Sequence, residues 1–254
     1  MAAVWTIARR EFRSSFLSPK AGAIYFFFLL CMGLFFFNFV RKFIELQQQA
    51  TGAGGGGATL EEVIRALFYN LHFILILIVP AVTMATFAED KKTQVYRLLQ
   101  TAPATATQIV FGKFLAVAGL MTAVLLSTLI YPLFLMKYGN PDLGVIASSY
   151  LGAFLLVMAQ LSFGLWVSTL TSSQIMAFLF TMLGLFGLLI LNWLASGLSG
   201  TGILEKVLQY IASTEHLDSF LKGMITVADT IYFLLFTALF LFLTNIVLDS
   251  QRWR

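Results

Sequence analysis

The stretch Ala66–Ala88, ALFYNLHFILILIVPAVTMATFA, decides the fold class, because it holds no Asp, Glu, Lys or Arg. About 20 apolar residues in a helix cross the roughly 30 Å hydrocarbon core of a bilayer. The stretch is followed at once by the charged cluster Glu89-Asp90-Lys91-Lys92. It therefore predicts a membrane-spanning helix over residues 66–88 that ends at a polar surface.

The rest of the chain repeats this character. Only 11% of the 254 residues are charged, against about 25% in a typical soluble domain, and 59% are hydrophobic. A soluble core could not bury so much apolar surface, so we predict an all-α polytopic membrane protein, with residues 1–254 as a single transmembrane domain. The third predicted span is overlong and contains Pro132, which predicts a tilt or kink. The six predicted spans cover residues 21–40, 66–88, 109–136, 144–170, 174–196 and 226–248.

The basic residues favour one orientation in the membrane, since cytoplasmic segments of membrane proteins are enriched in Lys and Arg. With the N-terminus inside, ten basic residues are cytoplasmic and six are outside. Both termini are then expected in the cytoplasm. The inner ten are Arg9, Arg10, Arg13, Lys20, Lys91, Lys92, Arg97, Lys113, Arg252 and Arg254, and the outer six are Arg41, Lys42, Arg65, Lys137, Lys206 and Lys222.

Residues 1–19 predict an amphipathic helix that lies in the membrane interface. Its apolar stripe is Met1, Trp5, Ala8, Phe12 and Phe16. Aromatic side chains of such a helix enter the acyl boundary, and arginines contact lipid phosphates. The helix is expected to break at Ser18-Pro19. Its candidate interfacial residues are Trp5, Arg9, Arg10, Glu11, Phe12, Arg13 and Phe16.

Two segments are expected on the outer side. Residues 41–65 form a loop whose glycine run, Gly54–Gly57, is typical of a flexible tether. Residues 197–225 are too polar to span the membrane and too apolar for a simple loop. Helical spacing over Ile203–Ile211 and a plausible N-cap at Thr214 predict two short helices there.

Residues that could act in catalysis or bind a metal are scarce in the sequence. His72 and His216 are the only histidines, on different outer segments, and the lone Cys31 lies inside an apolar run. The chain lacks the Gly-x-x-x-x-Gly-Lys-Ser/Thr sequence that cradles nucleotide phosphates. We therefore expect no catalytic residues, no cofactor or metal bound by this chain, and no enzymatic activity of its own.

Ionisable residues are also almost absent from the interiors of the predicted spans. Lys113 and Asp229 lie near span ends, where snorkelling or solvation accounts for them. Carriers driven by ion gradients place such residues inside the bundle. If this chain takes part in transport, another protein is expected to supply the energy.

The inner loop, residues 89–108, carries the most specific signal. A charged cluster, a short amphipathic helix and a proline stop predict a rigid cytoplasmic knob that docks into a groove of a soluble partner. The candidate docking residues are Glu89, Asp90, Lys91, Lys92, Tyr96, Arg97, Leu98, Leu99 and Pro103.

This loop resembles that of the membrane subunits of ABC-2 (type V) transporters, whose pattern is roughly A-E-E-[RK]-[RK]-x-G-T-x-E-L-L-x-x-x-P followed by G-K, here Gly112-Lys113. The start Arg9–Phe12, with Phe16 and Ser18-Pro19, is similar to the family's R-E-[FL]-x-x-x-[FL]-x-S-P. The resemblance covers essentially the whole chain. Within the family, the chain is most similar to the gliding-motility and nitrous-oxide-reductase-maturation permeases.

The resemblance implies a permease subunit that couples ATP hydrolysis to export of a substrate across the bacterial inner membrane. Residues 89–108 would contain the coupling helix and residues 1–19 the elbow helix. The implied partners are two copies of a cytoplasmic ABC ATPase, which bind ATP and Mg, and a second permease subunit, identical or homologous. Membrane lipids surround the chain. The net charge of +4 is accounted for by membrane topology, not by nucleic acid.

The loop departs from the family pattern at one place. Gln94-Val95-Tyr96-Arg97 stands where the family has G-T-x-E, so that Arg97 reverses a charge at the expected ATPase contact. Either the partner ATPase carries a matching change, or the coupling differs from the family norm.

Three functions are compared. The first is export by an ATP-driven permease. The second is a mechanotransmitting scaffold that passes ATPase motion to a large outer-domain partner without moving a solute. The third, an intramembrane enzyme, is disfavoured by the scarcity of His, Asp and Glu inside the spans. The spans do not identify a substrate, and a homodimer and a heterodimer fit equally well.

Overall fold

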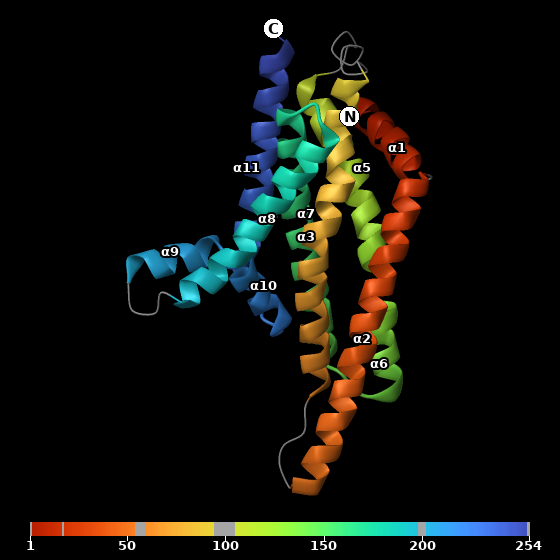
Figure 1. Cartoon of the computed structure of the whole chain (residues 1–254), viewed down its shortest axis with the longest axis vertical. Coiled ribbons are helices and arrows are strands. Elements are labelled where there is room, and N and C mark those ends of the chain that lie inside the picture. The colour runs from red at the N-terminus through yellow and green to blue at the C-terminus, as the bar shows by residue number, and fades with distance from the viewer. Residues whose placement is uncertain (1, 17, 54–58, 94–104, 198–201, 253–254) are drawn as a thin grey trace.

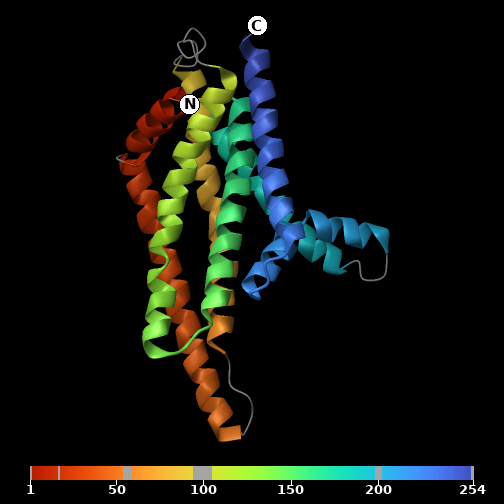
Figure 2. The same cartoon turned by 180° about the vertical axis from the view of Figure 1, so that it is seen from behind.

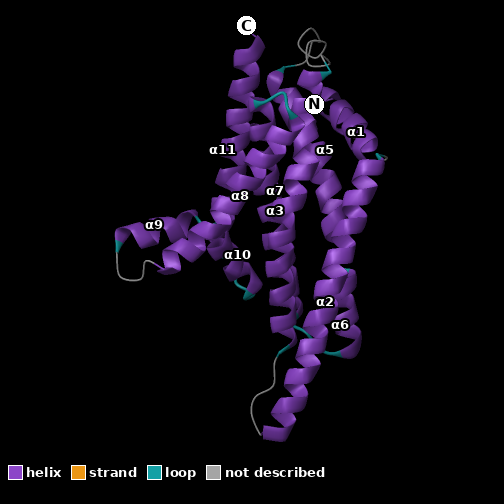
Figure 3. Cartoon of the chain, viewed as in Figure 1, coloured by secondary structure: helices purple, strands orange, loops and turns teal. Residues whose placement is uncertain are grey.

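The computed structural model of the chain describes residues 2–16, 18–53, 59–93, 105–197 and 202–252. Every regular element within these ranges is a helix, as Figure 3 shows. The prediction of an all-α protein is confirmed.

Six helical segments in the described residues are long and apolar enough to cross a membrane, which confirms the predicted number of spans. Three shorter helices accompany them: α1 (Ala2–Phe16), α9 (Ile203–Ile211) and α10 (Ser213–Leu221). In Figure 1, α9 projects sideways from the bundle. The spans are α2 (Pro19–Ala53), α3 (Leu60–Lys92), α5 (Ala106–Ser127) with α6 (Ile130–Tyr138), α7 (Leu143–Leu170), α8 (Gln174–Gly197) and α11 (Val227–Arg252).

The centre of the bundle is built from α3, α5 and α7. Val79 on α3 and Leu161 and Leu165 on α7 are fully buried. Gly164 brings α7 close to α3, because a Cβ atom there would lie 2.4 Å from Thr83 Oγ1. Small residues allow such close helix packing in membranes, where burial of apolar surface does not itself drive association.

The outer helices α2, α8 and α11 pack on this centre by one face each. Their other faces carry large exposed apolar side chains, which suit contact with lipid or with another membrane subunit. These include Phe26, Phe37, Leu183, Phe186, Leu235 and Phe242.

The third span is interrupted, as its proline predicts. The α-helix stops at Ser127 and resumes at Ile130. Pro132 has no N–H to donate to the Thr128 carbonyl, which instead accepts from the Tyr131 N–H at 3.1 Å. The Thr128 hydroxyl is 2.9 Å from the Tyr150 hydroxyl on α7, which ties the break to the centre of the bundle.

The first outer loop is shorter than expected. Helix α2 continues to Ala53 and α3 begins at Leu60, so most of the predicted loop 41–65 is helical. An i,i+4 ion pair, Arg41 Nε to Glu45 Oε1 at 3.0 Å, lies on this extension. The loop was misjudged because the apolar run ends near Val40 and polar helix formers carry the helix on. The expected tether Gly54–Gly57 lies outside the described residues.

Both chain termini lie at one end of the bundle, the upper end in Figures 1 and 2. The last turn of α3 and the start of α5 lie at this end too. The extension of α2 projects at the opposite, lower end, beyond the other helices. The described flanks of the predicted inner loop, at the end of α3 and the start of α5, therefore lie at the same end of the bundle as the start of α1 and the end of α11.

Candidate functional site

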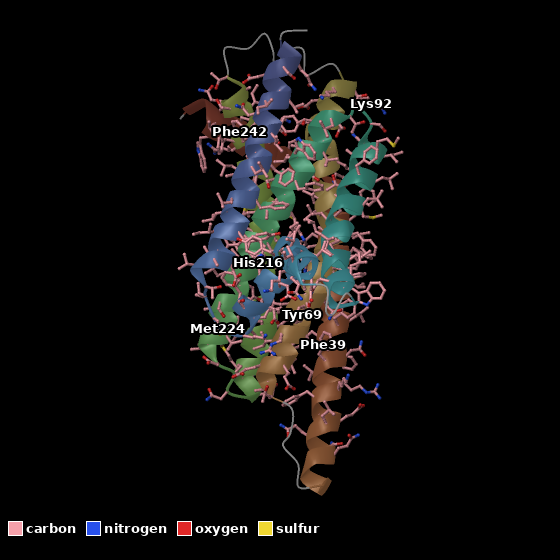
Figure 4. All side chains as sticks on the ribbon, turned by 90° about the vertical axis from the view of Figure 1, so that its left-hand side faces the viewer. Phe39, Tyr69, Lys92, His216, Met224 and Phe242 are labelled. Atoms are coloured by element: carbon pink, nitrogen blue, oxygen red, sulfur yellow. The ribbon has the colours of Figure 1, made fainter. Side chains whose placement is uncertain are left out.

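The upper end holds the described part of the predicted docking loop. Glu89, Asp90, Lys91 and Lys92 form the last turn of α3, and Figure 4 labels Lys92 there. The turn is closed by Thr93, whose N–H donates to the Glu89 carbonyl at 2.9 Å. The remaining predicted docking residues, Tyr96, Arg97, Leu98, Leu99 and Pro103, lie outside the described residues.

Lys113 of α5 is the central residue of this end. Its side chain is only 2% exposed, and its Nζ forms ion pairs with Asp90 Oδ2 at 2.7 Å and Glu11 Oε1 at 3.4 Å. It also donates to the Thr86 carbonyl at 2.7 Å and lies 5.1 Å from the centre of the Phe87 ring. A buried ammonium is tolerated only with such compensation. We call the group of Glu11, Asp90 and Lys113 the Lys113 joint.

The joint corrects the sequence interpretation of Lys113. The side chain does not snorkel to water, because it is buried among three helices, α1, α3 and α5. Its carboxylate partners come from distant parts of the sequence, and Glu11 is 102 positions away. The Gly112-Lys113 pair of the family pattern was the signal in the sequence that marked Lys113. The pair does not indicate how deeply the Lys113 side chain is buried or which carboxylates it contacts.

The last turn of α3 is also fastened to α7. Ser168 Oγ accepts from the N–H groups of Phe87 and Ala88, both at 3.2 Å. The Lys91 ammonium donates to the Thr169 carbonyl, which also accepts from Gln251 of α11 at 3.4 Å. The point where the predicted docking loop leaves the bundle is therefore linked to the central helix α7 and to α11.

Helix α1 packs on α5 through two glycines. A Cβ atom on Gly112 would lie 2.8 Å from Ile7 Cγ2, and one on Gly119 would lie 3.3 Å from the Phe12 ring. No larger residue at Gly112 would leave room for this contact. The close approach places Glu11 within reach of Lys113.

This packing divides the predicted apolar stripe of α1. Ala8 is 5% exposed and turned to the protein, whereas Trp5 is 69% and Phe16 57% exposed. The stripe is therefore not one lipid-facing surface, since a face containing Ile7, Ala8 and Phe12 packs on protein. The basic residues Arg9, Arg10 and Arg13 are exposed. An interfacial position of α1 remains a prediction.

A second polar cluster, remote from the upper end, joins α10 to α11. His216 Nδ1 lies 2.6 Å from Asp229 Oδ1, and its Nε2 donates to the Tyr210 carbonyl at 2.9 Å. Its ring stacks on Tyr232 at 3.9 Å between centroids. Asp229 is 9% exposed, so the interpretation that solvation accounts for it was wrong. The other histidine, His72, is buried in α3.

Asp218 of α10 forms a third polar link, between α10 and α3. It accepts from the hydroxyl of Tyr69 on α3 and pairs with Lys222 one turn further along α10. Burial opposes its ionisation, but the hydrogen bonds from Lys222 and Tyr69 prevail and hold the pKa of Asp218 below its ordinary value. Within the described residues, no group of three or more His, Cys, Asp or Glu side chains is arranged to hold a metal ion.

Comparison with known families accounts for this architecture. The family described as ABC-2 family transporter protein matches residues 5–251, from within α1 to the last turn of α11. No curated protein matches the chain. The family match covers all six spans and every residue of the Lys113 joint. The chain therefore belongs to the ABC-2 transporter family of membrane-spanning permeases, which work with an ABC ATPase and a second permease subunit.

Proposed function

We propose that this chain couples ATP hydrolysis by a separate cytoplasmic ATPase to the export of a substrate. The Lys113 joint carries the proposal. One buried ammonium ties the last turn of α3, where the predicted coupling loop begins, to α1 and α5. A force on that loop therefore acts on three helices at once.

The path of such a force continues into the bundle. The Ser168 hydroxyl and the Thr169 carbonyl fasten the same turn of α3 to α7. Helix α7 is the most buried of the spans and contacts α3, α5, α8, α10 and α11. Since packed interiors transmit strain rather than absorb it, displacement of α3 reaches the helices that surround α7.

The proposed setting follows from orientation and partners. The upper end, with Lys91, Lys92 and exposed Arg9, Arg10 and Arg13, would face the cytoplasm of a bacterium. ATP and Mg would be bound by the partner ATPase, present in two copies. A second permease subunit, identical or homologous, would cover part of the exposed apolar surface of α2, α8 and α11, and membrane lipids the rest.

Co-purification tests the proposal. The tagged full chain, extracted from native membranes in mild detergent, is expected to recover an ATPase subunit. Arg97→Glu is expected to weaken recovery, because it changes the charge of the predicted contact. Arg41→Glu is the matched control, since Arg41 lies on the lower-end extension of α2 with a side chain 70% exposed. Recovery of no ATPase with the wild-type chain refutes the coupling proposal.

A second candidate, force transmission to a large outer-domain protein, is favoured by the extension of α2. This helix runs on through Gln47–Gln49 and projects beyond the other helices at the lower end. Such a projection offers a surface to an outer partner. A photoreactive residue in place of Gln48 should capture an outer protein, whereas one in place of Trp193 should not. Capture by both positions, or by neither, counts against this candidate.

A further inference from the structure

The imidazole ring of His216, on α10, bridges α9 and α11. Its Nε2 lies 2.9 Å from the carbonyl oxygen of Tyr210, in the last turn of α9, and its Nδ1 lies 2.6 Å from Asp229 Oδ1 on α11. Figure 4 looks onto the side from which α9 projects in Figure 1, and it labels His216 at mid-height there. The ring is buried, with 6% of the residue exposed, so these two contacts fix the end of α9.

Both ring nitrogens of His216 face oxygen atoms that accept hydrogen bonds. The Tyr210 carbonyl has no proton to donate, and the Asp229 carboxylate also accepts from the Thr226 hydroxyl through its other oxygen. A neutral imidazole carries a single N–H, so its second nitrogen would present a lone pair to an oxygen lone pair. Two donated hydrogen bonds therefore require a proton on each nitrogen, which makes the ring a cation.

The surroundings of the ring favour this cation. The Tyr210 carbonyl belongs to the C-terminal turn of α9, where the helix dipole is negative. The aromatic ring of Tyr232 stacks on His216 with 3.9 Å between the ring centroids, and aromatic faces attract cations. The carboxylate of Asp229, the dipole of α9 and the Tyr232 ring thus all stabilise a proton on the same group.

Asp229 is the carboxylate that faces the ring. Asp218 pairs instead with Lys222, and Glu205 accepts from the Gln209 side chain at 3.4 Å. Helices α7 and α8, which also pack on α10, contain no Asp, Glu, His, Lys or Arg. The other charged groups on the turns around His216 are Arg65 of α3, Glu205 and Lys206 of α9, and Glu215, Asp218 and Lys222 of α10.

We propose that His216 is a proton-operated latch on α9. With both nitrogens protonated, the ring holds the last turn of α9 to α11. As the pH rises, the ring loses its Nε2 proton to solvent and keeps the Nδ1 proton, because the carboxylate is the stronger acceptor. The bare Nε2 then repels the Tyr210 carbonyl, so α9 is held at low pH and released at high pH. The Tyr232 hydroxyl, which donates to the Ile211 carbonyl at 2.7 Å, remains as a second tie.

The latch gives the outer side of the membrane control over α9. In the proposed orientation α9 and α10 lie on that side, so the outer pH would set the position of α9. The latch involves three helices of one subunit and requires no ATPase. Its failure would leave the proposed coupling function untouched, and failure of the coupling would leave the latch untouched.

Nitrogen-15 NMR of the imidazole ring follows the proton. The full chain is labelled with nitrogen-15 histidine and reconstituted in lipid nanodiscs. The chain has only two histidines, and His216→Phe identifies which signals belong to His216. Both ring nitrogens of His216 are expected to carry protons at acid pH, and Nδ1 alone at alkaline pH.

Spin labels report the position of α9 in the same samples. In a Cys31→Ser background, labels are attached at Lys206→Cys on α9 and Leu143→Cys at the start of α7. The ratio of held to released α9 is expected to fall at least about tenfold across the pH at which Nε2 loses its proton, because a hydrogen bond from a charged donor contributes about that factor or more. His72→Gln is the control and should keep the full response, because His72 is buried in α3.

The outcomes separate the latch from a purely structural contact. His216→Phe still stacks on Tyr232 but donates no hydrogen bond, so it should give the released distances at every pH. Unchanged distances in His216→Phe overturn the proposal, as do unchanged distances in the wild type when Nε2 has lost its proton. A ring with a single protonated nitrogen while α9 is held overturns it as well.

Discussion

Replacing Lys113 by methionine removes the charge of the Lys113 joint while keeping an unbranched side chain of similar length. The change deletes two ion pairs, with Asp90 at 2.7 Å and Glu11 at 3.4 Å, and the hydrogen bond to the Thr86 carbonyl. It leaves two carboxylates facing each other without a cation.

The expected cost follows from the exposure of those carboxylates. Removal of one partner from a buried ion pair costs about 3–5 kcal/mol. The side chains of Asp90 and Glu11 are 19% and 35% exposed, so each regains part of its hydration. We therefore expect the lower end, about 3 kcal/mol, which for a chain of this size lowers the melting temperature by roughly 6–12 °C.

The shift in melting temperature is measured by heating the purified protein in detergent and determining the fraction that remains monodisperse at each temperature. Lys137→Met is the control, because Lys137 is exposed at the lower end of α6, and a change of about 0.5 kcal/mol or less is expected there. The triple change Glu11→Gln, Asp90→Asn and Lys113→Met should recover stability to within about 1 kcal/mol of wild type, since no unpaired charge remains. If Lys113→Met and Lys137→Met have the same melting temperature, the Lys113 ammonium is solvated and the Lys113 joint does not exist.

Three further predictions concern packing, pH and topology. Gly112→Ala should destabilise the chain by about 1–3 kcal/mol and expose α1 to protease, because the added Cβ atom would lie 2.8 Å from a side chain of α1. Gly187→Ala is the control and should be neutral or stabilising, because a Cβ atom there would have nothing within 4 Å. The stability difference between wild type and Asp218→Asn should be full at neutral pH, because the folded state holds the pKa of Asp218 below its ordinary value of 3.8. The difference should begin to shrink as the pH falls below 3.8 and should be lost as the pH falls through the lowered pKa of the folded state; a difference that is as large at pH 2 as at pH 7 contradicts the prediction. In a cysteine-free background, Lys92→Cys should react with an impermeant thiol reagent only after the membrane is opened, and Gln48→Cys before; the reverse result inverts the proposed orientation.

The spans were predictable because hydrocarbon excludes charge. A stretch such as Ala66–Ala88, with no Asp, Glu, Lys or Arg, has few alternatives to crossing the bilayer, so the number of spans and the helical class followed from it. The length of α2 was not predictable in this way. Past Val40 the sequence loses its hydrophobicity, which predicts the end of the helix. The extension is favoured only by the helix propensity of its residues, which is a weaker signal.

The candidate site was predictable only in part. The charged turn Glu89–Lys92 was selected from composition and family resemblance, and the structure places it at the end of α3; its docking role stays a prediction. Lys113 and Asp229 were misinterpreted, because each is explained by a partner on another helix. Sequence distance hides such pairs: Glu11 is 102 positions from Lys113, and His216 is 13 from Asp229. Packing depth, which decides whether a charge is solvated or paired, is a tertiary property.

The order in which the Lys113 joint is synthesised has a consequence for how the protein is made. Glu11 and Asp90 leave the ribosome before Lys113, and the packing surface of α1 on α5 is made about a hundred residues after α1 itself. During insertion, most of the protein surface on which α1 packs is absent until the third span arrives. We expect the exposed Trp5 and Phe16, with the arginines beside them, to bind the newly synthesised α1 to the membrane interface until α5 is inserted. The joint thus closes only when three spans have been inserted, and a chain stalled before that point carries two unpaired acids.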